Sequence, residues 1–141
     1  MNMKYLSTII CCAAVIAAGI TFSACKSTAV DLSNCERVLG DDNNNQDVTV
    51  HKNKMLCVKL KAQLGTGYGW SVAGTGDILS LQGQPDTEPA AKNLPGGAEH
   101  QVFRFSAVKA GSGNLELHYI RPWLKNEPPA KKFKVKVTVV E

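Results

Sequence analysis

The fold is decided by the stretch Lys131-Lys132-Phe133-Lys134-Val135-Lys136-Val137-Thr138-Val139, in which polar and apolar residues alternate from Lys132 onward. Successive side chains of a β-strand point to opposite faces, so this spacing predicts a strand with one buried face and one face in water. The lysines then belong to the wet face. A nucleic-acid surface would instead interleave basic residues with exposed aromatic side chains, so the lysines do not indicate one.

The same period of two recurs along the chain, at Val48 and Val50, at Leu56, Val58 and Leu60, at Phe103, Phe105 and Ala107, and at Leu115, Leu117 and Tyr119. Tyr68 and Trp70 begin a further strand, in which we expect Trp70 to lie in the core. Turn-forming residues separate these segments at Asn53-Lys54, 65–69, 74–77, 95–97, 111–114 and Pro128-Pro129. No window shows a helical apolar stripe. Short strands with one apolar face must bury it against a second sheet, so the sequence predicts an all-β protein with a β-sandwich fold.

Length and composition bound the class of protein. A chain of 141 residues has room for one domain of ordinary size. Hydrophobic residues make up 44% and charged residues 20%, with a net charge of +4, which is typical of a globular protein and not of a disordered one.

The N-terminus carries the features of an export signal. A short basic start, Met1 to Lys4, precedes an apolar run from Leu6 to Ile20, which ends at Ser23-Ala24-Cys25. This ending resembles the bacterial lipobox, although Phe22 stands where that pattern usually has leucine. We therefore predict a lipoprotein signal peptide over 1–24, lipidation of Cys25, and a cell-envelope lipoprotein, outer-membrane or periplasm-facing, held at the membrane by its lipid anchor. The alternative is an ordinary signal peptide that is cut nearby.

Residues 25–46 read as a polar, lipid-anchored tether, because the run from Asp41 to Asp47 is hydrophilic and without periodicity. The folded domain is then expected over 47–141. Two cysteines remain outside the signal peptide and the lipidation site, Cys35 and Cys57. An exported protein meets an oxidising compartment, where a disulfide between them is allowed, and two separate buried thiols are the alternative.

Three stretches stand out from the predicted strands. The first, Gln63 to Trp70, contains Thr66 between two glycines, which predicts a tight exposed turn. The second, Leu94 to Glu99, contains Pro95, Gly96 and Gly97 and leads into a strand. The third, Arg121-Pro122-Trp123, ends a strand with a stiff proline that presents a cation and a large flat ring.

In this order, the three stretches resemble the loops of the chagasin family of cysteine-peptidase inhibitors. That family has an Asn-Pro-Thr-Thr-Gly-Tyr-x-Trp loop, a glycine-rich loop before a strand, and an Arg-Pro-Trp loop. The first motif matches here at Thr66, Gly67, Tyr68 and Trp70, and departs at residues 63–65, where the chain has Gln-Leu-Gly. The missing proline is expected to make the loop more flexible and to weaken binding.

The resemblance implies an immunoglobulin-like β-sandwich that inhibits papain-like cysteine peptidases reversibly and competitively, with three loops filling the active-site cleft. Thr66 would sit beside the catalytic Cys–His pair, the second loop would touch the non-primed side, and Trp123 would stack on the primed side with polar contacts from Arg121. The residues expected to contact the peptidase are Leu64, Gly65, Thr66, Gly67, Pro95, Gly96, Gly97, Arg121, Pro122 and Trp123. We also predict a monomer without cofactor or metal.

Two other interpretations stay open. The domain could be an immunoglobulin-like module of the cell envelope that binds a glycan or a partner protein through the same loops, and Arg121 could pair with a nearby carboxylate to support its loop. An enzyme is disfavoured, because no nucleophile–base or metal constellation appears and the three histidines are scattered. Gly111-Ser112-Gly113 lacks the spacing of a nucleophile elbow.

Overall fold

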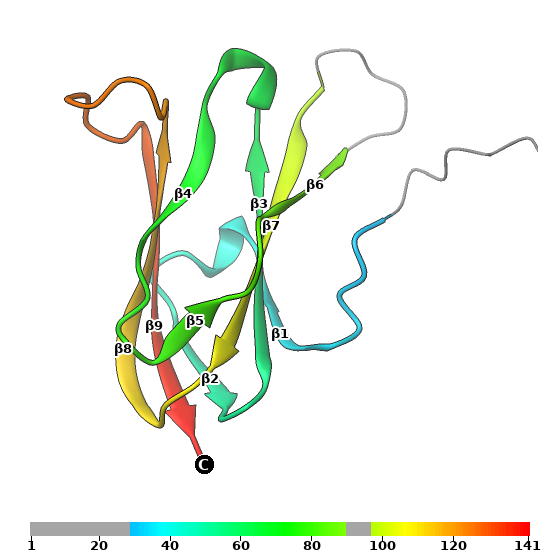
Figure 1. Ribbon diagram of the computed structural model, residues 1–141, viewed down its shortest axis with the longest axis vertical. Coiled ribbons are helices and arrows are strands. Elements are labelled where there is room, and N and C mark those ends of the chain that lie inside the picture. The colour runs from blue at the N-terminus through cyan, green and yellow to red at the C-terminus, as the bar shows by residue number, and fades with distance from the viewer. Residues whose placement is uncertain (1–28, 90–96) are drawn as a thin grey trace, which may run out of the picture.

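Two β-sheets pack face to face in the computed structural model, which describes residues 29–89 and 97–141 (Figure 1). The first sheet has the order β1-β3-β7-β5, and β6 also pairs with β7; its strands are β1 (Cys35–Leu39), β3 (Met55–Ala62), β7 (Glu99–Ala107), β5 (Leu79–Leu81) and β6 (Asp86–Pro89). The second sheet has the order β2-β9-β8-β4, with β2 (Asp47–His51), β9 (Lys131–Val140), β8 (Gly111–Ile120) and β4 (Gly69–Gly74). Two short 3-10 helices, η1 (Asp41–Asn43) and η2 (Leu64–Thr66), complete the described structure. The predicted all-β sandwich is confirmed.

The core lies between the sheets and contains the apolar side chains that the alternating pattern predicted to be buried. Phe133, Val135 and Val137 are at most 2% exposed, and the lysines between them are exposed. Trp70 is 7% exposed and belongs to the same cluster, as expected. The apolar faces of the alternating strands therefore meet across the two sheets, and this burial is the main stabilising term of the fold.

The predicted tether over 25–46 is wrong for its second half, because residues 35–39 form β1. This strand pairs in parallel with β3. Only Leu39 of its five side chains is buried, at 4% exposure. A strand that joins an edge mainly through its backbone shows no apolar alternation, which is why the sequence did not reveal it. In η1, which follows β1 along the chain, the Asp41 carboxylate accepts a hydrogen bond from the backbone N–H of Lys61 at 3.2 Å.

The turn predicted over 111–114 is also wrong, because these residues begin β8 and pair with β9. The chain bends at residues 109–110 instead. Gly113 serves a close approach of two backbones: a Cβ at this position would lie 2.9 Å from the carbonyl oxygen of Gly76. Gly76 itself has φ +63, so both glycines are explained by geometry at this contact.

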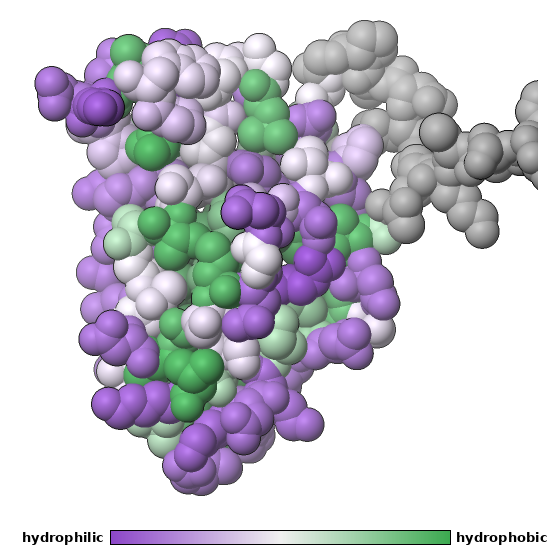
Figure 2. All heavy atoms as spheres, viewed as in Figure 1, coloured by the Kyte–Doolittle hydropathy of each residue, from purple (hydrophilic) through white to green (hydrophobic). Residues whose placement is uncertain are grey.

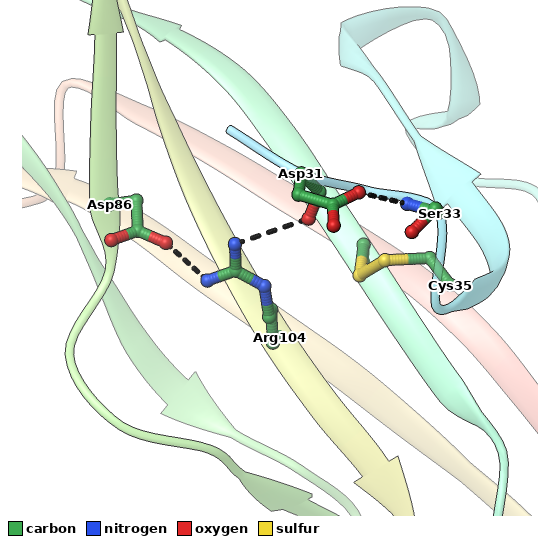
Figure 3. The surroundings of a disulfide bond; sticks show 6 residues. Asp31, Ser33, Cys35, Asp86 and Arg104 are labelled. Atoms are coloured by element: carbon green, nitrogen blue, oxygen red, sulfur yellow. Dashed lines mark hydrogen bonds and ion pairs between the residues drawn. A yellow bond between two sulfur atoms is a disulfide. The ribbon is translucent and has the colours of Figure 1, made fainter. Parts of the chain in front are cut away.

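A disulfide between Cys35 and Cys57 ties β1 to β3, with their Cα atoms 5.8 Å apart. Arg104 of β7 lies beside it and forms an ion pair with Asp86, while its second amino group donates to the backbone oxygen of Asp31 at 3.3 Å (Figure 3). The Ser33 backbone N–H donates to the Asp31 carboxylate, which lowers the pKa of Asp31. These contacts hold the segment before β1 against the first sheet.

A contact between Glu36 of β1 and His51 of β2 links the two sheets. The Glu36 carboxylate accepts the backbone N–H of His51 at 2.8 Å and lies 2.5 Å from its ring Nδ1. The backbone hydrogen bond and the imidazole together lower the pKa of Glu36. An ionised Glu36 therefore favours the docked position of β1.

Candidate functional site

Strand registers bring three loops to one end of the sandwich. The first loop (residues 63–68) connects β3 to β4, the second (90–98) connects β6 to β7, and the third (121–130) connects β8 to β9. Ala62 pairs with Glu99, so the start of the first loop lies beside the end of the second. Gly69 pairs with Ile120, so the end of the first loop lies beside the start of the third. The first and third loops lie at the top of Figure 1, and the C-terminus lies at the opposite end.

The first loop is a closed 3-10 turn. The backbone N–H of Thr66 donates to the Gln63 oxygen at 3.0 Å, and that of Gly67 donates to the Leu64 oxygen at 2.9 Å. The Thr66 hydroxyl donates to the same Gln63 oxygen at 2.6 Å. Gly67 has φ +82, a conformation that favours glycine, and it ends the turn. The turn thus keeps its shape through its own hydrogen bonds, without the proline of the family pattern.

The predicted contact residues of this loop divide into two groups. Gly65 and Thr66 are exposed at its tip. Leu64 instead is half-buried and packs against the core cluster. The side chain therefore lies partly against the core, because an apolar group at the end of the core is more stable when it covers apolar neighbours. That Leu64 also contacts the peptidase stays a prediction.

The third loop begins with a tight turn. The backbone N–H of Leu124 donates to the Arg121 oxygen at 3.0 Å, which places Pro122 at the second position, where its fixed φ suits a turn. Trp123 is 62% exposed. Its indole nevertheless lies against Gly67 of the first loop, since a Cβ at Gly67 would clash with Trp123 Cη2 and Cζ2. The first and third loops therefore form one continuous surface.

Aromatic side chains in contact with one another support this surface from below. The rings of Trp70 and Tyr119 lie 5.1 Å apart, and those of Tyr119 and Tyr68 lie 5.3 Å apart. The Arg121 guanidinium lies over Tyr68, 4.3 Å from the ring centroid, as in a cation–π contact. Arg121 forms no ion pair within residues 29–89 and 97–141, so the proposed carboxylate partner is replaced by an aromatic one.

Buried and partly buried hydrogen bonds fix the ends of the loops. The backbone N–H of Gln63 donates to the Tyr119 hydroxyl at 2.8 Å, and that of Trp70 donates to Gln101 Oε1 at 2.6 Å. The Trp70 indole N–H donates to the Lys61 oxygen at 2.9 Å. Sequence reasoning missed Gln101, although an amide two residues before Phe103, on the apolar face of a strand, was a usable signal. Buried polar groups are nearly always hydrogen-bonded, so such a position indicates a structural role.

A pocket of about 570 Å³ opens between the loops. It is lined by Lys61, Ala62, Gln63, Thr66, Tyr68, Ala98, Tyr119, Arg121 and Lys131. The lining residues come from all three loops and from the strands that carry them. Among the described residues, no three His, Cys, Asp or Glu side chains lie close enough to hold a metal ion.

Several predicted residues lie outside the described structure. These are Pro95 and Gly96 of the second loop, the signal peptide over 1–24 and Cys25. Gly97 is described and exposed. In the part of the chain that is described, no helix is long and apolar enough to cross a membrane.

The sequence matches a known protein family. The family model "Chagasin family peptidase inhibitor I42" matches residues 49–137. The chain belongs to the chagasin family of cysteine-peptidase inhibitors. Amoebiasin-1 of Entamoeba histolytica is 30% identical over 101 residues, which cover 72% of this chain and 97% of that protein.

Solved structures show the same fold. The chain is similar to the cysteine protease inhibitor EhICP2 from Entamoeba histolytica, with a TM-score of 0.65 and 23% identity over 74% of this chain and 95% of that one. It is also similar to PbICP-C in complex with falcipain-2, with a TM-score of 0.50 and 20% identity over 74% of this chain and 99% of that one. The predicted immunoglobulin-like β-sandwich and the chagasin resemblance are confirmed, and the family is one of inhibitors and not of enzymes.

Proposed function

We propose that this chagasin-family inhibitor places its three-loop end in the active-site cleft of a papain-like cysteine peptidase and blocks it reversibly and competitively. The family assignment and a similar fold seated on falcipain-2 support a cysteine peptidase as the partner. The contact residues that we propose are Gly65, Thr66, Gly67, Pro95, Gly96, Gly97, Arg121, Pro122 and Trp123.

The observation that carries this proposal is the contact between Trp123 and Gly67. It joins the exposed tip of the first loop to the largest exposed aromatic side chain of the described structure. A surface that is already assembled loses little conformational entropy on docking, and an exposed tryptophan beside an arginine is typical of a binding hot spot.

Thr66 suits the central position of the wedge. Its hydroxyl is occupied by Gln63, and its backbone N–H is held inside the same turn, so the tip presents a compact, closed shape. Such a turn does not offer an extended peptide bond for attack, which is why we expect the inhibitor to remain uncut. In Figure 2 the loop end shows pale residues of intermediate hydropathy with strongly hydrophilic (purple) and hydrophobic (green) residues beside them, as expected for an interface that mixes polar and apolar groups.

We propose in addition that Cys25 is lipidated and that the inhibitor works as a monomer at the cell envelope. The support is the Ser23-Ala24-Cys25 ending of the apolar N-terminal run. The disulfide fits an exported protein, because such bonds persist in oxidising compartments. Metabolic labelling with a clickable palmitate should mark the wild type, and Cys25→Ala should abolish the label.

Steady-state inhibition of papain and cathepsin L tests the proposed function. We expect inhibition that added substrate relieves, and an inhibitor of unchanged mass after long incubation with the enzyme. An alternative, a cell-envelope module that recognises a glycan or another protein, would leave both peptidases active at tens of micromolar inhibitor.

A further inference from the structure

The pocket between the loops is positively charged and has no acidic wall. Three of its lining side chains are cationic: Lys61, Arg121 and Lys131. None of the three forms an ion pair among the described residues, whereas Lys52 and Lys59 each pair with a glutamate elsewhere on the domain. Segments 1–28 and 90–96 contain no aspartate or glutamate, so the rest of the chain holds no carboxylate that could neutralise them.

Arg121 also carries an unsatisfied donor. Its Nε is buried and finds no hydrogen-bond partner among residues 29–89 and 97–141. The stacking of the guanidinium on Tyr68 leaves its N–H groups to point outward in the plane of the group. A guanidinium edge of this kind binds a carboxylate through two parallel hydrogen bonds, and an unpaired buried donor is unfavourable until it gains a partner.

The aromatic side chains of the pocket add a further donor. The Tyr119 hydroxyl oxygen already accepts the Gln63 N–H, so its hydrogen is free to donate to an anion. Lys131 Nζ lies 5.6 Å from the Tyr119 ring centroid, and both residues line the pocket. These groups fit a carboxylate on a short carbon stem, because the cations and the hydroxyl donor suit its oxygens and the apolar ring faces suit its stem.

We propose that this pocket binds a carboxylate, and that its source is an acidic side chain of the docked peptidase. The inference rests on the proposed function and adds Lys61 and Lys131 to the specificity-determining residues of the loop end. The pocket opens between loops that would face the cleft, so a side chain of the enzyme reaches it on docking. Binding would relieve the mutual repulsion of the three cations, so peptidases with an acidic residue at the facing position should be preferred.

The test compares inhibition constants for papain-like peptidases at low and high salt. Lys61→Met and Lys131→Met remove a charge but keep an apolar stem, and Lys109→Met, at the opposite end of the sandwich, is the control for net charge. We expect each pocket variant to inhibit about fivefold more weakly at low salt, with a smaller loss at high salt, and the control to match the wild type. Melting temperatures of the pocket variants should not fall, since each substitution removes a repulsion.

Two outcomes would overturn the inference while leaving the proposed function intact. In the first, the wild type inhibits and all three variants inhibit equally well. In the second, NMR of the Arg121 Nε–H signal shows that succinate saturates the free inhibitor below about 1 mM. That result would assign the pocket to a free carboxylate. If the wild type itself fails to inhibit, the proposed function fails instead.

Discussion

The indole of Trp123 lies against Gly67, and no side chain larger than hydrogen fits between them. The two residues belong to different loops and are brought together because β4 pairs with β8 immediately below them. The contact gives the loop end a fixed shape before any partner arrives. It also makes the conformation of the first loop and the position of the indole depend on one another.

Gly67→Ala should therefore weaken inhibition at least tenfold, since an added methyl group displaces Trp123 and the positive φ costs alanine about 1 to 2 kcal/mol. Gly74→Ala is the control, because a Cβ at Gly74 would meet nothing within 4 Å and this residue, at the end of β4, is not one of the proposed contacts. Inhibition constants and thermal melts of both variants check the prediction. Equal loss of thermal stability in the two variants would contradict the role assigned to the contact.

Tyr119→Phe should lower the stability by about 1 kcal/mol, because it leaves the Gln63 N–H without its acceptor while the ring stack is kept. Inhibition should weaken several-fold, since the first loop loses one of its anchors. Urea denaturation gives the free energy of unfolding. An unchanged Ki together with unchanged stability would show that the hydrogen bond is not needed.

Replacing both Cys35 and Cys57 by alanine should destabilise the domain by about 3 kcal/mol in the chain-entropy description, for a sequence separation of 22. Inhibition at a temperature where the variant is folded should be unaffected, because Cys57 pairs with Arg104 in the sheet, away from the loop end. Intact-mass measurement after alkylation without reductant should find no free thiol on the wild-type pair. Two alkylated cysteines on the folded wild type would contradict the bond.

Low pH should weaken the attachment of β1 to β2, because it protonates Glu36. The folded-state pKa of this carboxyl is lowered, so its contribution is present above the unfolded value and is lost as the pH falls through the folded one. Stability should therefore decline below about pH 4.3, the usual value for glutamate. Glu36→Gln should be less stable than the wild type at pH 7, and the difference should narrow at pH 3.5. A constant difference between urea melts at the two pH values would refute this.

The sequence predicted the parts of the fold that depend on side-chain burial. The positions of Phe133 and Val135 predict their strand, because burial of one face imposes an apolar period of two residues. β1 and β6 escaped prediction since their pairing depends on backbone hydrogen bonds to β3 and β7, which any side chain allows. β5, of three residues, is too short to show a period.

The sequence predicted the loops of the candidate site but not the residues that support these loops. Thr66 and Trp123 could be identified because their neighbouring glycines and proline mark turns. The stack of Tyr68 on Tyr119 and the cationic pocket between the loops depend on strand register, which places residues from distant parts of the chain side by side. For that reason Lys61 and Lys131 looked like ordinary residues on the wet faces of strands.

The Ki of Trp123→Ala for papain, measured beside the wild type, tests the central claim that the three-loop end occupies the cleft. The exposed indole lies at a loop tip, so the variant should keep the melting temperature of the wild type. An aromatic anchor of this kind carries about 2 kcal/mol or more, so its loss should raise Ki about thirtyfold. A folded variant that inhibits papain as strongly as the wild type would contradict the account.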